Sequence, residues 1–282
     1  MNYKKTYTPK NGYTPLCEIG KCSLKDLEFG ILELSDGQSY TYETKDREVA
    51  FIILGGKANF TANGKDYGMV GARRNVFENP KAECFYAPRN CSVKIDSPWN
   101  IKIAVCSTPI DVDSEPQAIH QADVRVVRLG VKPWERDTSF IVDGSTNAKK
   151  LTIGEAYITP GNWAGFPPHK HDVDNMPSEG VLEEIYYFLF DPQQGFGVQC
   201  LYTSDGEIDE AYRVKNDELV EFPRGYHTTV GAPGYNTYFL ILDAIKRANS
   251  SDPKAITKAL AERQRQITKT LTHFLFSFVT EL

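Results

Sequence analysis

The sequence predicts an all-β protein of two barrel or sandwich domains, followed by a C-terminal helix. Short β-branched and aromatic runs alternate with turn residues over roughly the first 245 residues, as in residues 49–54, which lead into Gly55-Gly56. Two landmarks recur in the two halves of the chain, which indicates a duplicated domain. After about residue 248 the apolar residues change to helical spacing.

Size and composition are those of a folded globular protein. The chain has 282 residues, of which 41% are hydrophobic and 24% charged, with a formal net charge of -5, so it can fill two ordinary domains. The scattered basic residues disfavour a nucleic-acid partner. The sequence contains no run of about 18 apolar residues, so it predicts no membrane-spanning helix.

The start of the chain and its cysteines point to a cytoplasmic location. The first residues contain no apolar run that resembles a secretory leader. Six unevenly spaced cysteines favour reduced, mostly buried thiols.

The expected strands can be placed along the chain in order. Asn63-Gly64 lies between two strand-like runs and suits a type I′ hairpin turn, because both central residues of that turn have positive φ. Further strands are expected at residues 93–95, 101–105, 151–153, 185–190 and 238–242.

The repeated landmarks divide the chain into domains. Glu48 opens an apolar run and precedes Pro88 by 40 residues, while Glu184 opens a similar run and precedes Pro223 by 39. We therefore expect an N-terminal β domain over residues 1–120 and a second β domain over residues 121–247.

Residues 248–282 form the expected helical tail. Ser251-Asp252-Pro253 can cap and open a helix, and apolar residues then recur in an approximately helical stripe from Ile256 to Leu282. This face has no marked basic side, so we expect it to dock on its own chain or on a partner subunit rather than on a membrane. A homo-oligomer is favoured.

Metal-ligand residues concentrate in the second half. His169 and His171 alternate along an extended strand, so both side chains point to one face. Glu184 begins the next apolar strand, and the turn at residues 223–227 supplies His227. Three imidazoles and a carboxylate suit one first-row divalent ion, Zn, Mn, Fe or Ni, with open positions for substrate. The corresponding position of the first half is Ser92, so only the second half is expected to hold the ion.

These elements resemble the two cupin motifs, one with the HxH pair and a Glu, the other with a Pro-x-Gly turn and a His. The longer strings GNWxxxPPHKHD, LEEIYYF, DPQQGFGVQCLYT and PRGYH, over about residues 150–240, resemble the 5-deoxy-glucuronate isomerase family of inositol catabolism. The chain departs from that family at residues 164–166, where hydroxyl side chains are usual, and at residues 242–245. The resemblance implies a double cupin that interconverts 5-deoxy-glucuronate and 2-deoxy-5-keto-gluconate, an aldose–ketose isomerisation.

Such a reaction needs a base and a binding site for a sugar acid. A base must remove a proton from carbon, and the candidates near the motif are Glu183, Tyr186, Tyr202 and Lys170. For the substrate carboxylate the nearest cation is Arg224, with Arg73 next. Gln199, Tyr202 and Tyr226 are expected to line the pocket.

Two other functions fit the same site. One is a different cupin enzyme acting on a sugar acid, either a 4-deoxy-5-keto-uronate isomerase or a dioxygenase, because a fold does not determine its chemistry. The other is a non-catalytic sugar-acid binding protein. Oxygen consumption would favour the dioxygenase, and binding without turnover would favour the binding protein.

Overall fold

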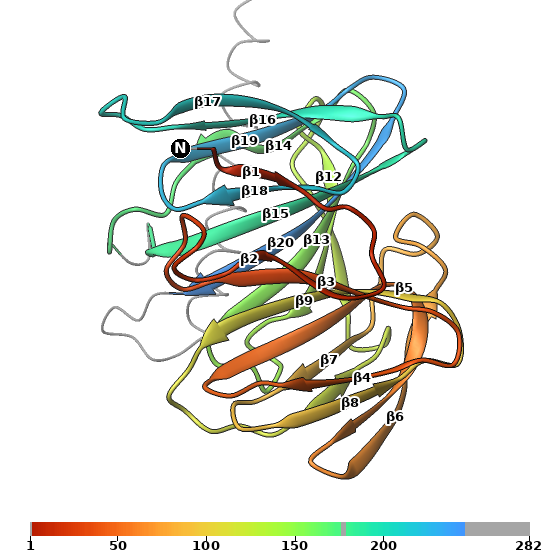
Figure 1. The fold of residues 1–282 in the computed structure, drawn as a ribbon. Helices are drawn as coiled ribbons and strands as arrows, with labels where there is room; N and C mark the ends of the chain where they lie inside the picture. Colours follow the sequence, from red (N-terminus) through yellow and green to blue (C-terminus); the bar gives the residue numbers. More distant parts are fainter. Residues whose placement is uncertain (1, 176–178, 246–282) are drawn as a thin grey trace, which may run out of the picture.

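The computed structural model describes residues 2–175 and 179–245, and within these ranges it contains strands, turns and bends but no α-helix (Figure 1). The expected helical tail lies outside the described residues. In the part of the chain that the structure describes, no helix is long and apolar enough to span a bilayer.

Three sheets make up the described part of the chain. A nine-stranded sheet contains β2 (Gly12–Cys17), β3 (Glu28–Leu34), β4 (Ser39–Glu43), β5 (Arg47–Ala62), β6 (Lys65–Arg73), β7 (Cys84–Ala87), β8 (Ser92–Asp96), β9 (Ile101–Pro109) and β10 (Gln117–Ile119). A seven-stranded sheet has the order β1 (Lys4–Thr6), β18 (Glu218–Phe222), β15 (Leu182–Asp191), β20 (Asn236–Ile245), β13 (Leu151–Ile158), β12 (Arg136–Val142) and β11 (Arg125–Leu129). A four-stranded sheet has the order β14 (Trp163–His169), β19 (Tyr226–Gly231), β16 (Phe196–Tyr202) and β17 (Asp209–Lys215).

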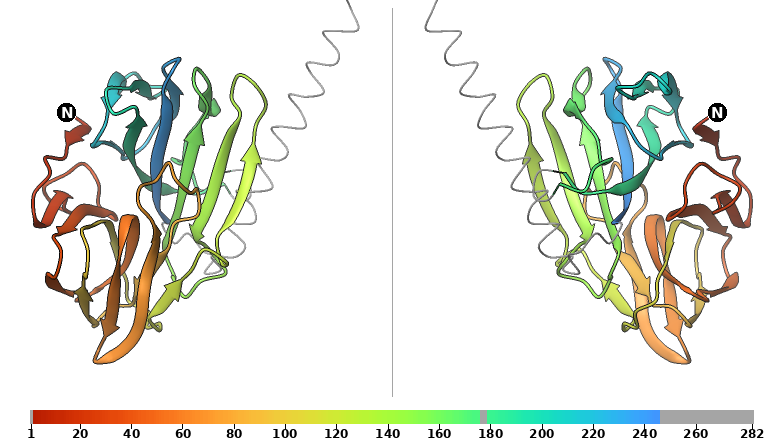
Figure 2. Two further views of the ribbon diagram at one scale, coloured as in Figure 1. Left: turned by 90° about the vertical axis from the view of Figure 1, so that its right-hand side faces the viewer. Right: turned by 90° about the vertical axis from the view of Figure 1, so that its left-hand side faces the viewer.

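The three sheets enclose three hydrophobic cores. One core lies within the first barrel, around Phe51 and Phe60, and another lies between the four- and seven-stranded sheets, around Phe188 and Phe239. The third joins the two barrels and includes Tyr187. The first half, coloured red to yellow in Figure 2, therefore packs against the green and blue second half through this shared core. This is the double-barrel architecture that the sequence predicted.

Two local features of the first barrel follow from its turn residues. Asn63 and Gly64 have φ values of 49° and 81°, and β5 and β6 pair on either side of them, so the hairpin prediction is confirmed. The strand expected at residues 49–54 does not stop at Gly55-Gly56 but continues through a bulge to Ala62. A Cβ added at Gly56, where φ is 95°, would lie 2.4 Å from the carbonyl oxygen of Asn100, so only glycine fits this bend.

Two features of the chain's first residues were not foreseen. β1 pairs with β18, so one strand of the first 120 residues belongs to the sheet of the second barrel. Cys17 and Cys22 form a disulfide, so the expectation of reduced thiols is wrong for this pair. The other four cysteines are free, and Cys84, Cys91 and Cys106 are buried.

Candidate metal centre

The candidate site lies inside the second barrel, where the two facing sheets each supply ligands. His169 and His227 are directly opposite each other in the β14–β19 pair. His171 follows β14, and Glu184 comes from β15 of the other sheet. A site assembled in this way depends on the closed barrel rather than on one strand.

The structure brings all four predicted ligands together. One ligand atom from each of His169, His171, Glu184 and His227 lies within 4.8 Å of the others. Glu184 Oε1 lies 3.3 Å from His171 Nε2, and Glu184 Oε2 lies 2.7 Å from His227 Nε2. His169 is partly exposed and the other three are buried, so one side of the cluster remains open.

The buried polar atoms of this cluster suit a cation. His171 Nδ1, His227 Nε2 and Glu184 Oε2 are buried, and none makes a hydrogen bond with residues 2–175 or 179–245. The contact between His227 Nε2 and Glu184 Oε2 is short but lacks hydrogen-bond geometry. Buried polar groups without partners are rare and costly, and three nitrogens with one carboxylate fit a first-row divalent ion.

Burial and interactions within the cluster shift the pKa values of three of the four candidate ligands. Burial and the neighbouring His227 and His171 lower the pKa of His169 well below its usual value, which keeps that imidazole neutral. Burial disfavours the charged form of Glu184, but His227 and His171 outweigh it and hold the Glu184 pKa well below its usual range. Burial likewise opposes charge on His227, yet Glu184 raises the His227 pKa. Glu184 is therefore ionised at neutral pH, as a metal ligand must be.

Asp243 is a neighbour of the cluster that the sequence analysis did not select. It lies directly opposite Glu184 in the β15–β20 register. Burial, and then the charge of Glu184, raise the Asp243 pKa well above its usual value. Asp243 therefore retains a proton that it can donate to Glu184. The only signal in the sequence was the departure at residues 242–245.

Tyr186 is the one predicted base that faces the cluster. It lies two residues after Glu184 on β15, and its ring is 5.8 Å from the ring of His227. The ring packs against Phe222 and Phe239. Burial raises the pKa of Tyr186 well above its ordinary value, so the hydroxyl stays protonated.

Gln199 also faces the interior of the second barrel. In the β16–β19 pair Gln199 is opposite Thr229, and two residues along Leu201 is opposite His227, so Gln199 shares the face of His227. Its Oε1 accepts a hydrogen bond from the Thr229 hydroxyl, and its Nε2 donates to the Thr228 carbonyl oxygen at 3.0 Å. Gln199 is thus a fixed part of the wall.

Glu183 points away from the cluster, into the contact between the barrels. Its Oε2 accepts hydrogen bonds from the backbone N–H groups of Lys25 and Asp26, both at 2.9 Å. Glu48 makes the reciprocal contact, since it accepts backbone hydrogen bonds from residues 149–151 of the second half. The structural counterpart of Glu48 is therefore Glu183, with a spacing of 40 residues to Pro223.

The sequence aligned Glu48 with Glu184, whereas the structure aligns Glu48 with Glu183, so the internal repeat is shifted by one position. Val49, which follows Glu48, occupies the place of the ligand Glu184. Val49 belongs to the core of the first barrel. This exchange, together with Ser92 in place of a histidine, leaves the first barrel without the carboxylate and imidazole that the second retains.

Tyr202, Tyr226 and Lys170 lie outside the barrel wall. Tyr202 and Tyr226 stack on each other at 5.5 Å between ring centroids, on the face opposite to Leu201 and His227. Lys170 alternates with the two ligand histidines, forms an ion pair of 2.6 Å with Glu179, and lies 5.9 Å from the Tyr226 ring. The structure does not bring these three side chains to the cluster.

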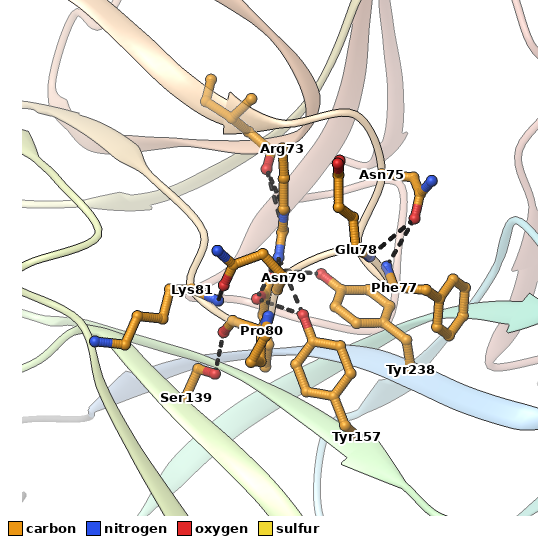
Figure 3. Close-up of polar contacts among 12 residues, drawn as sticks. Arg73, Asn75, Phe77, Glu78, Asn79, Pro80, Lys81, Ser139, Tyr157 and Tyr238 are labelled. Atoms are coloured by element: carbon orange, nitrogen blue, oxygen red, sulfur yellow. Dashed lines mark hydrogen bonds and ion pairs between the residues drawn. The ribbon is translucent and has the colours of Figure 1, made fainter.

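The two predicted carboxylate-binding arginines are both engaged elsewhere. Arg224 pairs with Asp205 at 2.9 Å and with Glu207. Arg73 lies buried between the barrels, where it contacts the Asn79 carbonyl oxygen and the Tyr157 hydroxyl (Figure 3) and forms a 2.5 Å ion pair with Glu155.

The remaining histidines lie apart from the cluster. His120 is half exposed and lies 3.3 Å from Glu83. His273 lies outside the described residues.

Two β-barrels in one chain, with three histidines and a glutamate inside the second, define a double cupin with a candidate metal centre in its second barrel. The model of the KduI/IolB family matches residues 3–250 of the 282, and the chain belongs to this family.

Individual relatives agree with this assignment. The chain is 37% identical to the 5-deoxy-glucuronate isomerase of Geobacillus kaustophilus, over 75% of this chain and 77% of that protein. It is 36% identical to the 5-deoxy-glucuronate isomerase of Bacillus subtilis, over 84% of this chain and 88% of that protein.

Solved structures show the same architecture. A crystal structure of an IolB-like protein from Salmonella typhimurium has a TM-score of 0.83 and 29% identity, and the match covers 89% of this chain and 94% of that one. The oxalate decarboxylase of Lactobacillus farciminis, at 11% identity and a TM-score of 0.63, shares the fold over 93% of this chain and 90% of its own.

Proposed function

We propose that this chain is a metal-dependent aldose–ketose isomerase that converts 5-deoxy-glucuronate to 2-deoxy-5-keto-gluconate in inositol catabolism. The observation that carries the proposal is the complete set of three histidines and a glutamate, gathered within 4.8 Å in a family whose relatives bear that name. The fold alone would not support it, because cupin-like barrels serve unrelated reactions.

The four ligands would hold one divalent ion, Zn, Mn, Fe or Ni. When bound, the ion supplies a Lewis acid for the substrate carbonyl and its neighbouring hydroxyl. Glu184 contributes the negative charge of the ligand set, and Asp243 positions Glu184 by donating a hydrogen bond to it. Buried His171 and His227 exclude water from the inner side of the site.

Among the predicted bases, we assign a role only to Tyr186. In the isomerisation, a proton leaves the hydroxyl-bearing carbon and a proton is added at the former aldehyde carbon, while one hydroxyl proton moves between the two oxygens. Tyr186 keeps its proton at neutral pH and faces His227, so it suits the transfer between oxygens. Glu183, Tyr202 and Lys170 have no part in this proposal, because their side chains point elsewhere.

We also propose that the protein acts in the cytoplasm as a homo-oligomer. The support for the homo-oligomer is the apolar stripe in the sequence of the tail and the lack of a metal motif in the first half. Light scattering of the full chain and of a chain ending at residue 247 tests this. Unchanged assembly after truncation would remove the tail from the interface, and a monomeric full chain would refute the oligomer.

The deciding experiment couples metal analysis to turnover. Purified protein should contain about one divalent ion per chain and should convert 5-deoxy-glucuronate, followed by nuclear magnetic resonance. His171→Ala should lose both properties. The matched control is His120→Ala, which removes a half-exposed histidine of the other half and should retain both.

The outcomes separate the parts of the proposal. Bound metal without conversion in the wild type would refute the isomerase and favour a sugar-acid binding protein. Conversion that survives complete removal of metal would refute the metal dependence.

A further inference from the structure

Arg136 is a buried arginine for which the described residues supply no carboxylate partner. It begins β12, and only 8% of its surface is exposed. Its Nη1 is buried without a hydrogen bond, and no ion pair joins Arg136 to any residue in the described ranges. By contrast, the buried Arg73 pairs with Glu155. An unpaired buried charge is costly, so its presence calls for a partner that binds from outside.

The register of β12 directs Arg136 into the second barrel. Arg136 lies opposite Ile158 in the β12–β13 pair, and Ile158 belongs to the core of that barrel. Residues directly opposite each other in a sheet share a face. The guanidinium therefore enters the interior that also contains the metal ligands.

Packing along the same face relates Arg136 to the candidate site. Thr237 lies opposite Ile158 in the β13–β20 pair, and Phe239, two residues further along β20, shares its face. The ring of Phe239 lies 4.7 Å from the ring of Tyr186, which lies 5.8 Å from the ring of His227. Residues on the face of Arg136 therefore pack as far as the ligand cluster.

Two hydroxyl groups on the same face also lack partners. Thr138 follows Arg136 by two residues, and Thr237 lies opposite Ile158 on its other side. Thr138 Oγ1 and Thr237 Oγ1 are buried and make no hydrogen bond within residues 2–175 and 179–245. One cation and two hydroxyl donors on one face match the needs of an anion.

We propose that Arg136, with Thr138 and Thr237, binds the carboxylate of a sugar acid whose reacting end lies at the metal cluster. The inference deepens the proposed function and rests on it for the reacting end. A uronate carries its carboxylate at the end of the carbon chain opposite its aldehyde. The substrate then extends from the cluster past Tyr186 to Arg136, whose planar guanidinium can donate two parallel hydrogen bonds to the carboxylate.

Titration calorimetry of the metal-loaded protein tests this site with D-glucuronate and with D-glucose, its counterpart without the carboxylate. Wild type should bind D-glucuronate more tightly. Arg136→Met should weaken that binding on the order of 100-fold and leave D-glucose binding unchanged. Arg136→Lys, which keeps the charge but not the fork of donors, should fall between them. The control Arg128→Met, on the neighbouring β11 and paired with Asp137, should match wild type.

Thermal unfolding separates a binding role from a structural one. Arg136→Met should melt at the same temperature as wild type or higher, because it removes a buried unpaired charge. Its metal content should not change. In turnover assays, Arg136→Met should show its loss mainly as a raised KM for the anionic substrate.

Three results would overturn the inference. They are equal affinity of wild type for both sugars, unchanged D-glucuronate affinity in Arg136→Met, and a loss of affinity that merely follows lowered stability. If instead D-glucuronate binds through Arg136 while 5-deoxy-glucuronate is not converted, the carboxylate site stands and the isomerase proposal fails.

Discussion

Replacing Arg73 with methionine is expected to lower the free energy of unfolding by about 3–5 kcal/mol, the usual cost of removing one partner of a buried ion pair. Arg73 is 3% exposed and Glu155 is fully buried. Without Arg73, the Glu155 carboxylate would retain, among the described residues, the hydroxyls of Tyr238 and Tyr157, at 2.7 and 3.1 Å. The carbonyl oxygens of Ile53 and Asn79 would also lose their donor.

The expected change in melting temperature follows from this loss. A chain of this size loses roughly 2–4 °C per kcal/mol, so Arg73→Met should melt roughly 6–20 °C lower. Adding Glu155→Gln should recover much of the loss, because it removes the unpaired charge while keeping an acceptor for the tyrosines.

Urea unfolding followed by circular dichroism measures the effect. The control is Arg74→Met, which removes an adjacent arginine whose side chain is 88% exposed and forms an ion pair with Glu78 on the surface. Arg73→Met should retain its KM for substrate below its melting temperature. Stability equal to that of Arg74→Met, or a large rise in KM without unfolding, would refute the structural role of Arg73.

Other predictions concern the candidate metal centre. Glu184→Gln should abolish stoichiometric metal content, measured by plasma mass spectrometry, since it removes the anionic ligand; normal content would contradict the ligand assignment. Asp243→Ala should weaken metal affinity about 10- to 100-fold, whereas Asp243→Asn, which keeps a donor, should lose less; equal losses would exclude the hydrogen bond to Glu184. Tyr186→Phe should lower kcat by about 100-fold or more with metal content unchanged, and full activity would remove Tyr186 from the mechanism. In metal-free protein Glu184 raises the His227 pKa, and a metal ion must displace the proton of His227 in order to bind. Metal affinity, measured by competition with a chelator, should therefore rise about tenfold per pH unit below the His227 pKa and level off above it. Metal affinity independent of pH would contradict this.

The fold could be predicted because its signals are local. The hairpin at Asn63-Gly64 depends on two adjacent positive φ angles, and the continuous apolar run of β15 reflects burial of both strand faces. The pairing of β1 with β18 had no such signal, since it joins segments more than 200 residues apart. The disulfide between Cys17 and Cys22 was likewise missed, because the pairing depends on how that loop folds back.

The ligand set was predictable for a similar reason. His169 and His171 share a face by the period of an extended strand, whatever the rest of the fold does. The same period places Lys170 on the other face, as the structure shows. The repeat was read one residue out of register, however, because Glu183 and Glu184 are adjacent in the sequence and only strand pairing decides which of them enters the barrel.

The sequence by itself determined the all-β duplicated architecture and the three histidines and glutamate of the candidate centre, since both follow from side-chain period and local turn chemistry. Only the tertiary structure decided which arginines have carboxylate partners. Arg73, Arg136 and Arg224 look alike along the chain, but Arg73 and Arg224 have carboxylate partners and Arg136 has none among the described residues. The physical reason is that the partner of a buried charge is set by contacts between strands distant in sequence, which no local pattern encodes.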